Sequence, residues 1–135
     1  ALPSLGGEDW LVPARAQATA IAITPVFNTL LERDEKTGLP APGLATTQPV
    51  LYHLRHEGGR REIALVAEAP DGRVVAIEIK SSAAPTKNDA VHLAWLRDRL
   101  GDAFTAGVVF HTGPRRIPLG DRIEALPIAA IWGPR

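Results

Sequence analysis

Glu78 and Lys80 are the residues whose types and spacing point most directly to chemistry. They stand two positions apart at the end of an apolar run, so on a β-strand both side chains would lie on one face. A carboxylate can hold Mg²⁺ beside a phosphate, and a lysine can stabilise the negative charge that develops during cleavage. This pattern is typical of metal-dependent phosphodiester hydrolysis, which also needs an acid on a neighbouring strand.

The residues before Glu78 predict a hairpin that would provide this neighbouring strand. Residues 61–80 read REIALVAEAPDGRVVAIEIK, with apolar positions alternating on both sides of a Pro-Asp-Gly turn. The proline favours a type I turn and the glycine a left-handed residue, so we expect a three-residue loop. In that register Ala64 lies opposite Glu78 and Glu62 opposite Lys80, all on one face. The other face of the first strand would consist of Ile63, Leu65 and Ala67.

Ala64 has no ligand atom, which leaves two interpretations of this face. In the first, Glu62 supplies the second carboxylate beside Glu78, and the two bind a metal with rearranged geometry. In the second, Glu62 forms a cross-strand ion pair with Lys80, which would contribute up to about 1 kcal/mol. We favour the ion pair. Without Glu62, Glu78 alone would make a poor magnesium site, because Mg²⁺ releases its water reluctantly. The expected cofactor is therefore none, or Mg²⁺ if any.

The remaining polar residues provide weaker candidates. The four histidines, at positions 53, 56, 92 and 111, have no metal-binding spacing; we expect them at the surface or at strand edges, with His53 and His56 on opposite faces of a strand. The absence of cysteine excludes disulfides and zinc sites built on thiolates. Candidate phosphate contacts are Lys80, Lys87, Arg60 and Arg61, although basic residues in solvated turns often bind nothing.

The composition is that of one globular domain. The chain has 135 residues and 45% hydrophobic content, enough for a substantial core. Fifteen basic residues balance fifteen acidic ones, so no overall charge attracts the chain to a polyanion. The sequence shows no signal peptide and no apolar run near the roughly 20 residues of a membrane helix. We therefore expect a cytoplasmic location and no membrane contact.

The local patterns divide the chain into elements. Residues 1–13, rich in proline and glycine, predict a linker or tail, and residues 14–135 a single domain. Thr24 and Pro25 are typical of a helix start, and residues 38–49 of a loop. Residues 14–23, rich in alanine, predict a helix, although residues 21–23 could equally form a short strand. Further strands are expected at residues 50–57 and 104–111, a turn at residues 58–59, and a short strand with a final turn over residues 117–132.

A helix is expected from residue 88 to Leu100, capped by Asn88 or Asp89 and ended by Gly101. Leucines at positions 93, 96 and 100 form a stripe that should pack on the sheet. Val91 and Trp95 lie nearly opposite. Another part of this chain, a second copy in a homodimer, or another domain could cover these two side chains. We slightly favour cover within the chain.

The ordered series of these motifs resembles the DUF4143 domain, a PD-(D/E)xK nuclease-like domain at the C-terminus of prokaryotic AAA-type ATPases. Members of that family typically read EVDLV, EVKAS and FETFV where this chain has EIALV at residues 62–66, EIKSS at 78–82 and FNTLL at 27–31. Segments at residues 100–104, 107–113, 118–122 and 125–127 also fit. The resemblance covers about residues 24–132.

This resemblance implies an α/β fold with a restriction-endonuclease-like core, in which helices flank a mixed central β-sheet. Glu78 and Lys80 would be the remnant of the catalytic motif, while Ala64 and Asn28 stand at substituted acidic positions. The implied function is a catalytically degenerate module that follows an N-terminal ATPase domain and contacts nucleic acid, such as DNA, or protein. The alternatives are a metal-dependent DNA endonuclease with Glu62 and Glu78 as ligands, and a dimerisation domain.

Overall fold

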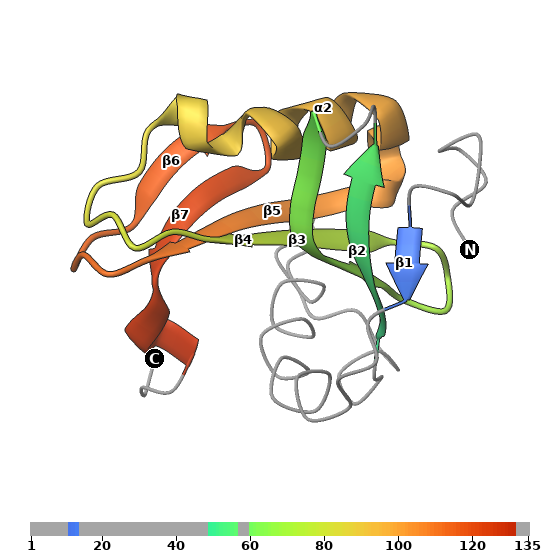
Figure 1. The fold of residues 1–135 in the computed structure, drawn as a ribbon, viewed down its shortest axis with the longest axis horizontal. Coiled ribbons are helices and arrows are strands. Elements are labelled where there is room, and N and C mark those ends of the chain that lie inside the picture. Colours follow the sequence, from blue (N-terminus) through green and yellow to red (C-terminus); the bar gives the residue numbers. More distant parts are fainter. Residues whose placement is uncertain (1–10, 14–48, 57–59, 132–135) are drawn as a thin grey trace.

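The computed structural model describes residues 11–13, 49–56 and 60–131 (Figure 1). Within these residues the strands form one sheet in the order β1-β2-β3-β4-β5-β7-β6. The strands are β1 (Leu11–Pro13), β2 (Val50–His56), β3 (Arg61–Glu68), β4 (Val74–Ile79), β5 (Phe104–His111), β6 (Ile117–Gly120) and β7 (Ile123–Pro127). The helical segments are α2 (Val91–Leu100) and the 3-10 turns η3 (Lys87–Ala90), η4 (Gly101–Ala103) and η5 (Ile128–Ile131).

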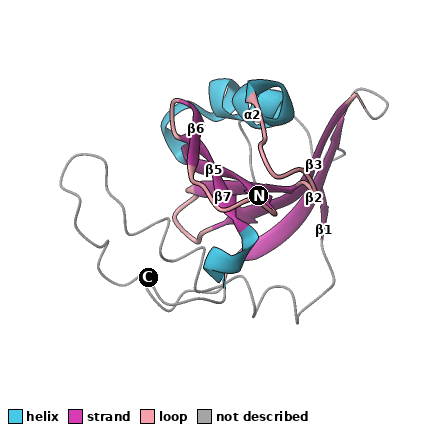
Figure 2. Cartoon of the chain, turned by 90° about the vertical axis from the view of Figure 1, so that its left-hand side faces the viewer, coloured by secondary structure: helices cyan, strands magenta, loops and turns pink. Residues whose placement is uncertain are grey.

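The sheet is mixed, which confirms the expected α/β class. Strands β1 to β4 pair antiparallel in sequence order, β4–β5 and β5–β7 pair parallel, and β6–β7 pair antiparallel. A parallel pair needs a crossover connection, and α2 provides it between β4 and β5. Figure 2 shows α2 lying along one side of the sheet.

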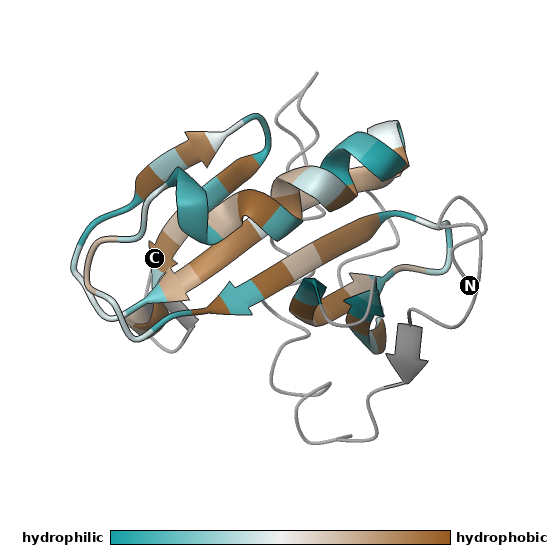
Figure 3. Ribbon diagram, turned by 45° about the horizontal axis from the view of Figure 1, so that its top comes forward, coloured by the Kyte–Doolittle hydropathy of each residue, from teal (hydrophilic) through white to brown (hydrophobic). Residues whose placement is uncertain are grey.

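The leucine stripe of α2 forms the centre of the first core, as the sequence predicted. Leu93, Leu96 and Leu100 are all buried, because their spacing places them on one helical face. The residues of this α2-side core on the sheet are Leu54, Ile63, Val66, Val74, Ala76, Phe104, Val109, Leu119, Ile123 and Ala125. Figure 3 shows the apolar positions of β4 and β5 beneath the helix.

The opposite face of the sheet carries a second buried cluster. Its members are Leu51, Leu65, Ala67, Ala69, Val75, Ile77, Val108 and Phe110. Neighbouring residues of β4 alternate between the two clusters, as the two-residue period of a strand requires. The central strands are therefore buried on both faces.

The helix begins differently from the expectation. Thr86, rather than Asn88 or Asp89, stands at the N-cap of the first turn, η3. Asp89 lies inside that turn, and its carboxylate accepts a 2.8 Å hydrogen bond from the Thr86 backbone N–H. A bond from the N-cap backbone N–H to the side chain of the third helical residue is a feature of the capping box. The end is as expected, since Gly101 with a φ of 59° follows the last residue of α2.

Two other boundaries correct the sequence analysis. Residues 11–13, expected in a linker or tail, form β1 and pair with β2. Residues 117–127, expected to hold one short strand, form the β6–β7 hairpin. The expectations for residues 14–36, for the loop at 38–48 and for the turn at 58–59 lie outside the described residues.

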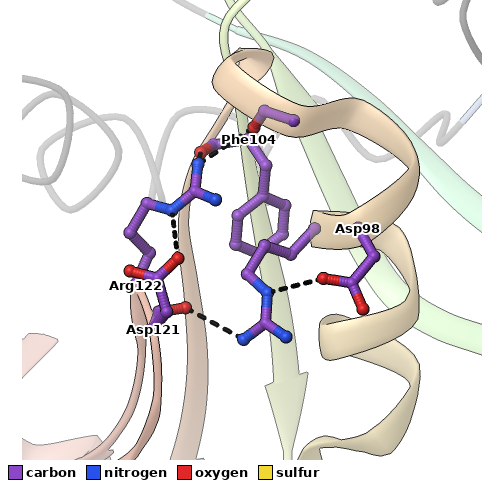
Figure 4. Close-up of polar contacts among 6 residues, drawn as sticks. Asp98, Phe104, Asp121 and Arg122 are labelled. Carbon is purple, nitrogen blue, oxygen red and sulfur yellow. Dashed lines mark hydrogen bonds and ion pairs between the residues drawn. The ribbon is translucent and has the colours of Figure 1, made fainter.

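Arg122 ties the β6–β7 hairpin to the end of the helical segment (Figure 4). It adopts a left-handed φ of 59°, and its Nη1 donates to the carbonyl oxygens of Gly101 at 2.9 Å and Phe104 at 2.6 Å. From α2, Arg97 Nη1 donates to the Asp121 carbonyl oxygen at 3.2 Å. These bonds hold the hairpin against the start of β5.

Candidate functional site

The β3–β4 hairpin has the expected register. Leu65 pairs with Ile77 and Glu68 with Val74. The Ala69 backbone N–H donates to the Arg73 carbonyl oxygen at 2.8 Å, which closes the three-residue loop. In the same register Ala64 stands opposite Glu78, as predicted.

Asp71, in the loop, bonds to the strand that follows. Burial alone would raise the pKa of the Asp71 carboxyl group. The backbone N–H and the guanidinium of Arg73 outweigh that effect and hold this pKa below its usual range. The Arg73 Nε to Asp71 Oδ2 distance is 2.8 Å. The acid therefore supports the turn that sets the register.

A β-bulge at Ala64 changes the geometry next to Glu78. Tyr52 pairs with Val66, but Leu54 pairs with Ile63, so β3 has one residue more than β2 in this interval. His53 lies opposite the bulge, and its Nδ1 donates to the Ala64 carbonyl oxygen at 2.6 Å. The bulge therefore interrupts the alternation of β3 between Ile63 and Leu65.

The bulge separates side chains that the sequence analysis placed together. Ile63 packs in the α2-side core, whereas Leu65 packs in the opposite cluster, so the expectation of a common face was wrong. By the same alternation, Glu62 lies on the face away from α2, and Glu78, two residues after Ala76, lies on the α2 side. The expected shared face of Glu62 and Glu78 is therefore also wrong.

Glu62 pairs with β2 and not with β4. Its Oε1 lies 3.3 Å from Nε of Arg55, its cross-strand neighbour. Both side chains are more than half exposed, so this pair contributes little to stability. No ion pair joins Glu62 to Lys80 among the described residues, which corrects the interpretation that we had favoured.

The Glu78 carboxylate bonds to the backbone of Ala64, the residue opposite it. Its Oε1 accepts a 2.8 Å hydrogen bond from the N–H of Ala64. The bonded β3–β4 pairs end at Leu65 and Ile77, so this side chain continues the connection one step further. The carboxylate that would be a metal ligand in an active site thus holds the two strands together.

These residues do not fit a magnesium site. Position 64 offers only a methyl group, Glu62 lies on the other face, and one oxygen of Glu78 is engaged with the backbone. Within residues 11–13, 49–56 and 60–131, no cluster of three or more His, Asp or Glu residues could hold a metal ion. Asn28 lies outside the described residues.

Comparison with protein families decides the classification. The model of the DUF4143 family, described as a domain of unknown function, matches residues 24–131. The chain belongs to the DUF4143 family. No curated protein and no solved structure matched the chain. In the part of this DUF4143 domain that the structure describes, no helix is long and apolar enough to cross a membrane.

In the DUF4143 domain, Lys80 lies where β4 ends beside β5. Its backbone N–H donates to the Phe110 carbonyl oxygen at 2.8 Å, and its side chain is half-buried. Thr112 joins the following loop through its Oγ1 to the Ser81 carbonyl oxygen at 3.1 Å and its N–H to the Ser82 carbonyl oxygen at 3.2 Å. Both serines are exposed loop residues.

His111, expected at the surface or at a strand edge, is fully buried at the end of β5. Its Nδ1 accepts a 3.0 Å hydrogen bond from the Gly113 N–H, and its Nε2 has no partner among the described residues. The apolar run of β5 immediately before this position was the available signal of its burial. His53 and His56 lie on opposite faces of β2, as expected, since His56 faces α2.

The other candidate phosphate contacts, besides Lys80, fall into two groups. Arg61 at the start of β3 places its guanidinium carbon 5.4 Å from the Trp95 ring centroid, with the exposed Arg60 next to it. Lys87 opens η3, and the helical segment separates it from Trp95 by about 12 Å. The structure also brings Arg99 to the same ring, at 5.6 Å, which the sequence analysis missed.

Trp95 is half-buried against its own chain. The His56 ring stacks on it with the centroids 5.8 Å apart and an interplanar angle of 25°. Val91, one turn earlier, is 46% exposed. Cover of Trp95 within the chain therefore agrees with the expectation that we had favoured, while a homodimer through this face stays a prediction.

Proposed function

We propose that this DUF4143 domain is a catalytically degenerate nuclease-like module that acts by contact and does not hydrolyse phosphodiesters. The observation that carries the proposal is the bond from the Ala64 N–H to the Glu78 carboxylate. It gives the acid of the Glu-x-Lys element a structural role that needs no metal. The PD-(D/E)xK relationship itself rests on the resemblance of the motifs.

The charge balance at the site supports this proposal. Hydrolysis by this chemistry requires carboxylates that hold a metal against the scissile phosphate. Here one acidic position is Ala64, and the bulge at that residue moves Glu62 to the other face of β3. The alternative of an endonuclease with Glu62 and Glu78 as joint ligands therefore has no geometric support.

The resemblance also supports a place for the domain in a larger protein. We propose that it follows an ATPase domain in a cytoplasmic protein and connects that domain to a binding partner. A contact module needs only a stable surface, and the sheet buried on both faces provides a rigid support for one.

Metal titration and cleavage together test the proposal. We expect no heat of Mg²⁺ or Mn²⁺ binding by calorimetry and no nicking of supercoiled plasmid with either ion. Metal-dependent nicking that disappears in Glu78→Ala would overturn the proposal. Loss of nicking in Glu62→Gln as well would establish the endonuclease with rearranged ligands.

Ala64→Asp provides the matched gain-of-function variant. It restores an acid opposite Glu78 and changes no other residue of the hairpin. We expect this variant to bind Mn²⁺ measurably where the wild type does not. Equal metal binding by both proteins would show that position 64 does not limit the site.

A further inference from the structure

Three elements, β2, β3 and α2, meet around the ring of Trp95. His56 of β2 stacks on Trp95, and the guanidinium groups of Arg61 from β3 and Arg99 from α2 lie over the same ring. The exposed Arg60 precedes β3. We call these five residues the Trp95 surface. We propose that the Trp95 surface binds the phosphate backbone of nucleic acid.

The charge of this surface is locally positive in a chain of zero net charge. Within the described residues neither Arg60 nor Arg61 forms an ion pair with a carboxylate. The neighbouring arginines differ, because Arg55 pairs with Glu62 and Arg97 with Asp98. Arg60 and Arg61 therefore place two charges at the Trp95 surface that no carboxylate of the described residues pairs, and these charges can attract a polyanion over about one Debye length, roughly 8–10 Å.

The Trp95 ring orients the guanidinium groups of Arg61 and Arg99 that lie over it. A guanidinium held over an aromatic face within about 6 Å gains cation–π energy and loses side-chain freedom before any ligand arrives. Its planar N–H edges match phosphate oxygens in a two-point contact. The entropy cost of binding is therefore lower here than for arginines on a flexible loop.

The partner's repeated charge favours nucleic acid over an acidic peptide. Duplex DNA carries one phosphate about every 3.4 Å along each strand, so a strand that crosses the Trp95 surface brings several phosphates near Arg61 and Arg99. The Trp95 ring is already covered by His56 and the two guanidinium groups, so it does not offer a platform for a base. Binding should consequently depend on salt and not on base sequence.

This inference builds on the proposed contact function, but it concerns a different surface from Glu78. The assay therefore contains EDTA, which prevents metal-dependent cleavage. Fluorescence anisotropy of the full chain with a labelled duplex of mixed sequence measures affinity between 50 and 200 mM salt. Single-stranded DNA and polyglutamate serve as separate ligands. Arg60→Gln/Arg61→Gln tests the surface, Arg99→Gln tests the α2 contribution, and Arg115→Gln/Arg116→Gln is a control with the same charge change on the β5–β6 side.

We expect the Arg60→Gln/Arg61→Gln variant to bind duplex about tenfold more weakly at low salt, with a salt slope smaller by about 1.8 for two lost phosphate contacts. Arg99→Gln should lower the slope by about 0.9, and the control should stay within twofold of wild type.

Equal losses in the control, no binding of either DNA, or polyglutamate binding as tight as duplex would each overturn the inference. Retention of single-stranded binding alone would restrict the ligand to unpaired strands. Circular dichroism of each variant confirms the fold, and cleavage without EDTA would refute only the proposed function.

Discussion

Replacement of Glu78 distinguishes a structural acid from a catalytic one. The Glu78→Ala variant removes the carboxylate that accepts the Ala64 N–H at 2.8 Å. Hydrogen bonds to charged groups contribute about 1.5–3 kcal/mol when buried. Ala64 is exposed and Glu78 half-buried, so water can replace part of this bond. We therefore expect a loss below this range, about 1 kcal/mol.

Urea unfolding measures that loss. With a slope of about 1.5 kcal/mol per molar urea, a loss of about 1 kcal/mol lowers the midpoint by about 0.7 M. Glu78→Gln keeps a side-chain oxygen as acceptor without its charge, so its midpoint should fall about half as far. The control is Glu62→Ala, which breaks an exposed ion pair with Arg55 and should cost only about 0.3 kcal/mol.

The pattern of the three variants decides the outcome. A Glu78→Ala variant as stable as wild type would refute the structural role, whatever its activity. A Glu78→Ala variant more stable than wild type would have a different meaning. It would indicate that the carboxylate is strained or repelled in the folded protein, as functional acids can be.

Other perturbations test the surroundings of the site. Gly107→Ala places a methyl group 2.9 Å from the buried Phe104 ring, so thermal unfolding should show a loss of about 1–3 kcal/mol; an unchanged midpoint would mean that the core can shift. Asp71→Asn should lower stability slightly at neutral pH, because the lowered pKa of Asp71 favours the folded state above its unfolded pKa. That difference should vanish in unfolding experiments as the pH falls through the folded pKa, below 3.8. Leu96→Ala should cost about 2–5 kcal/mol by urea unfolding and would contradict the assigned core if it cost less than 1 kcal/mol.

Local patterns were sufficient where neighbouring residues decide the structure. The Pro-Asp-Gly loop set the β3–β4 register, because a three-residue turn leaves one pairing of the flanking strands. The leucine spacing of α2 identified its buried face, and Gly101 its end, because both depend on helical geometry alone. The mixed α/β class was implied by the family resemblance, which rests on the ordered series of motifs.

Other features depend on partners distant in sequence. The turn alone could not show the bulge at Ala64, because a bulge is defined by the mismatch with β2. His111 was expected at the surface or at a strand edge because the histidines have no metal-binding spacing, yet the Gly113 N–H provides it with a hydrogen bond in the interior. Arg99 was missed because only tertiary packing brings α2 against the start of β3.

The sequence by itself therefore determined the pairing of the hairpin from its loop as far as Ala64 and Glu78, and with it the absence of a carboxylate opposite Glu78. Only the tertiary structure decided on which faces the remaining acids lie. One extra residue in β3 changes the side of Glu62, because side-chain direction alternates at every residue of a strand. It also decided that Glu78 bonds to the Ala64 backbone, since that contact joins two strands whose ladder has already ended.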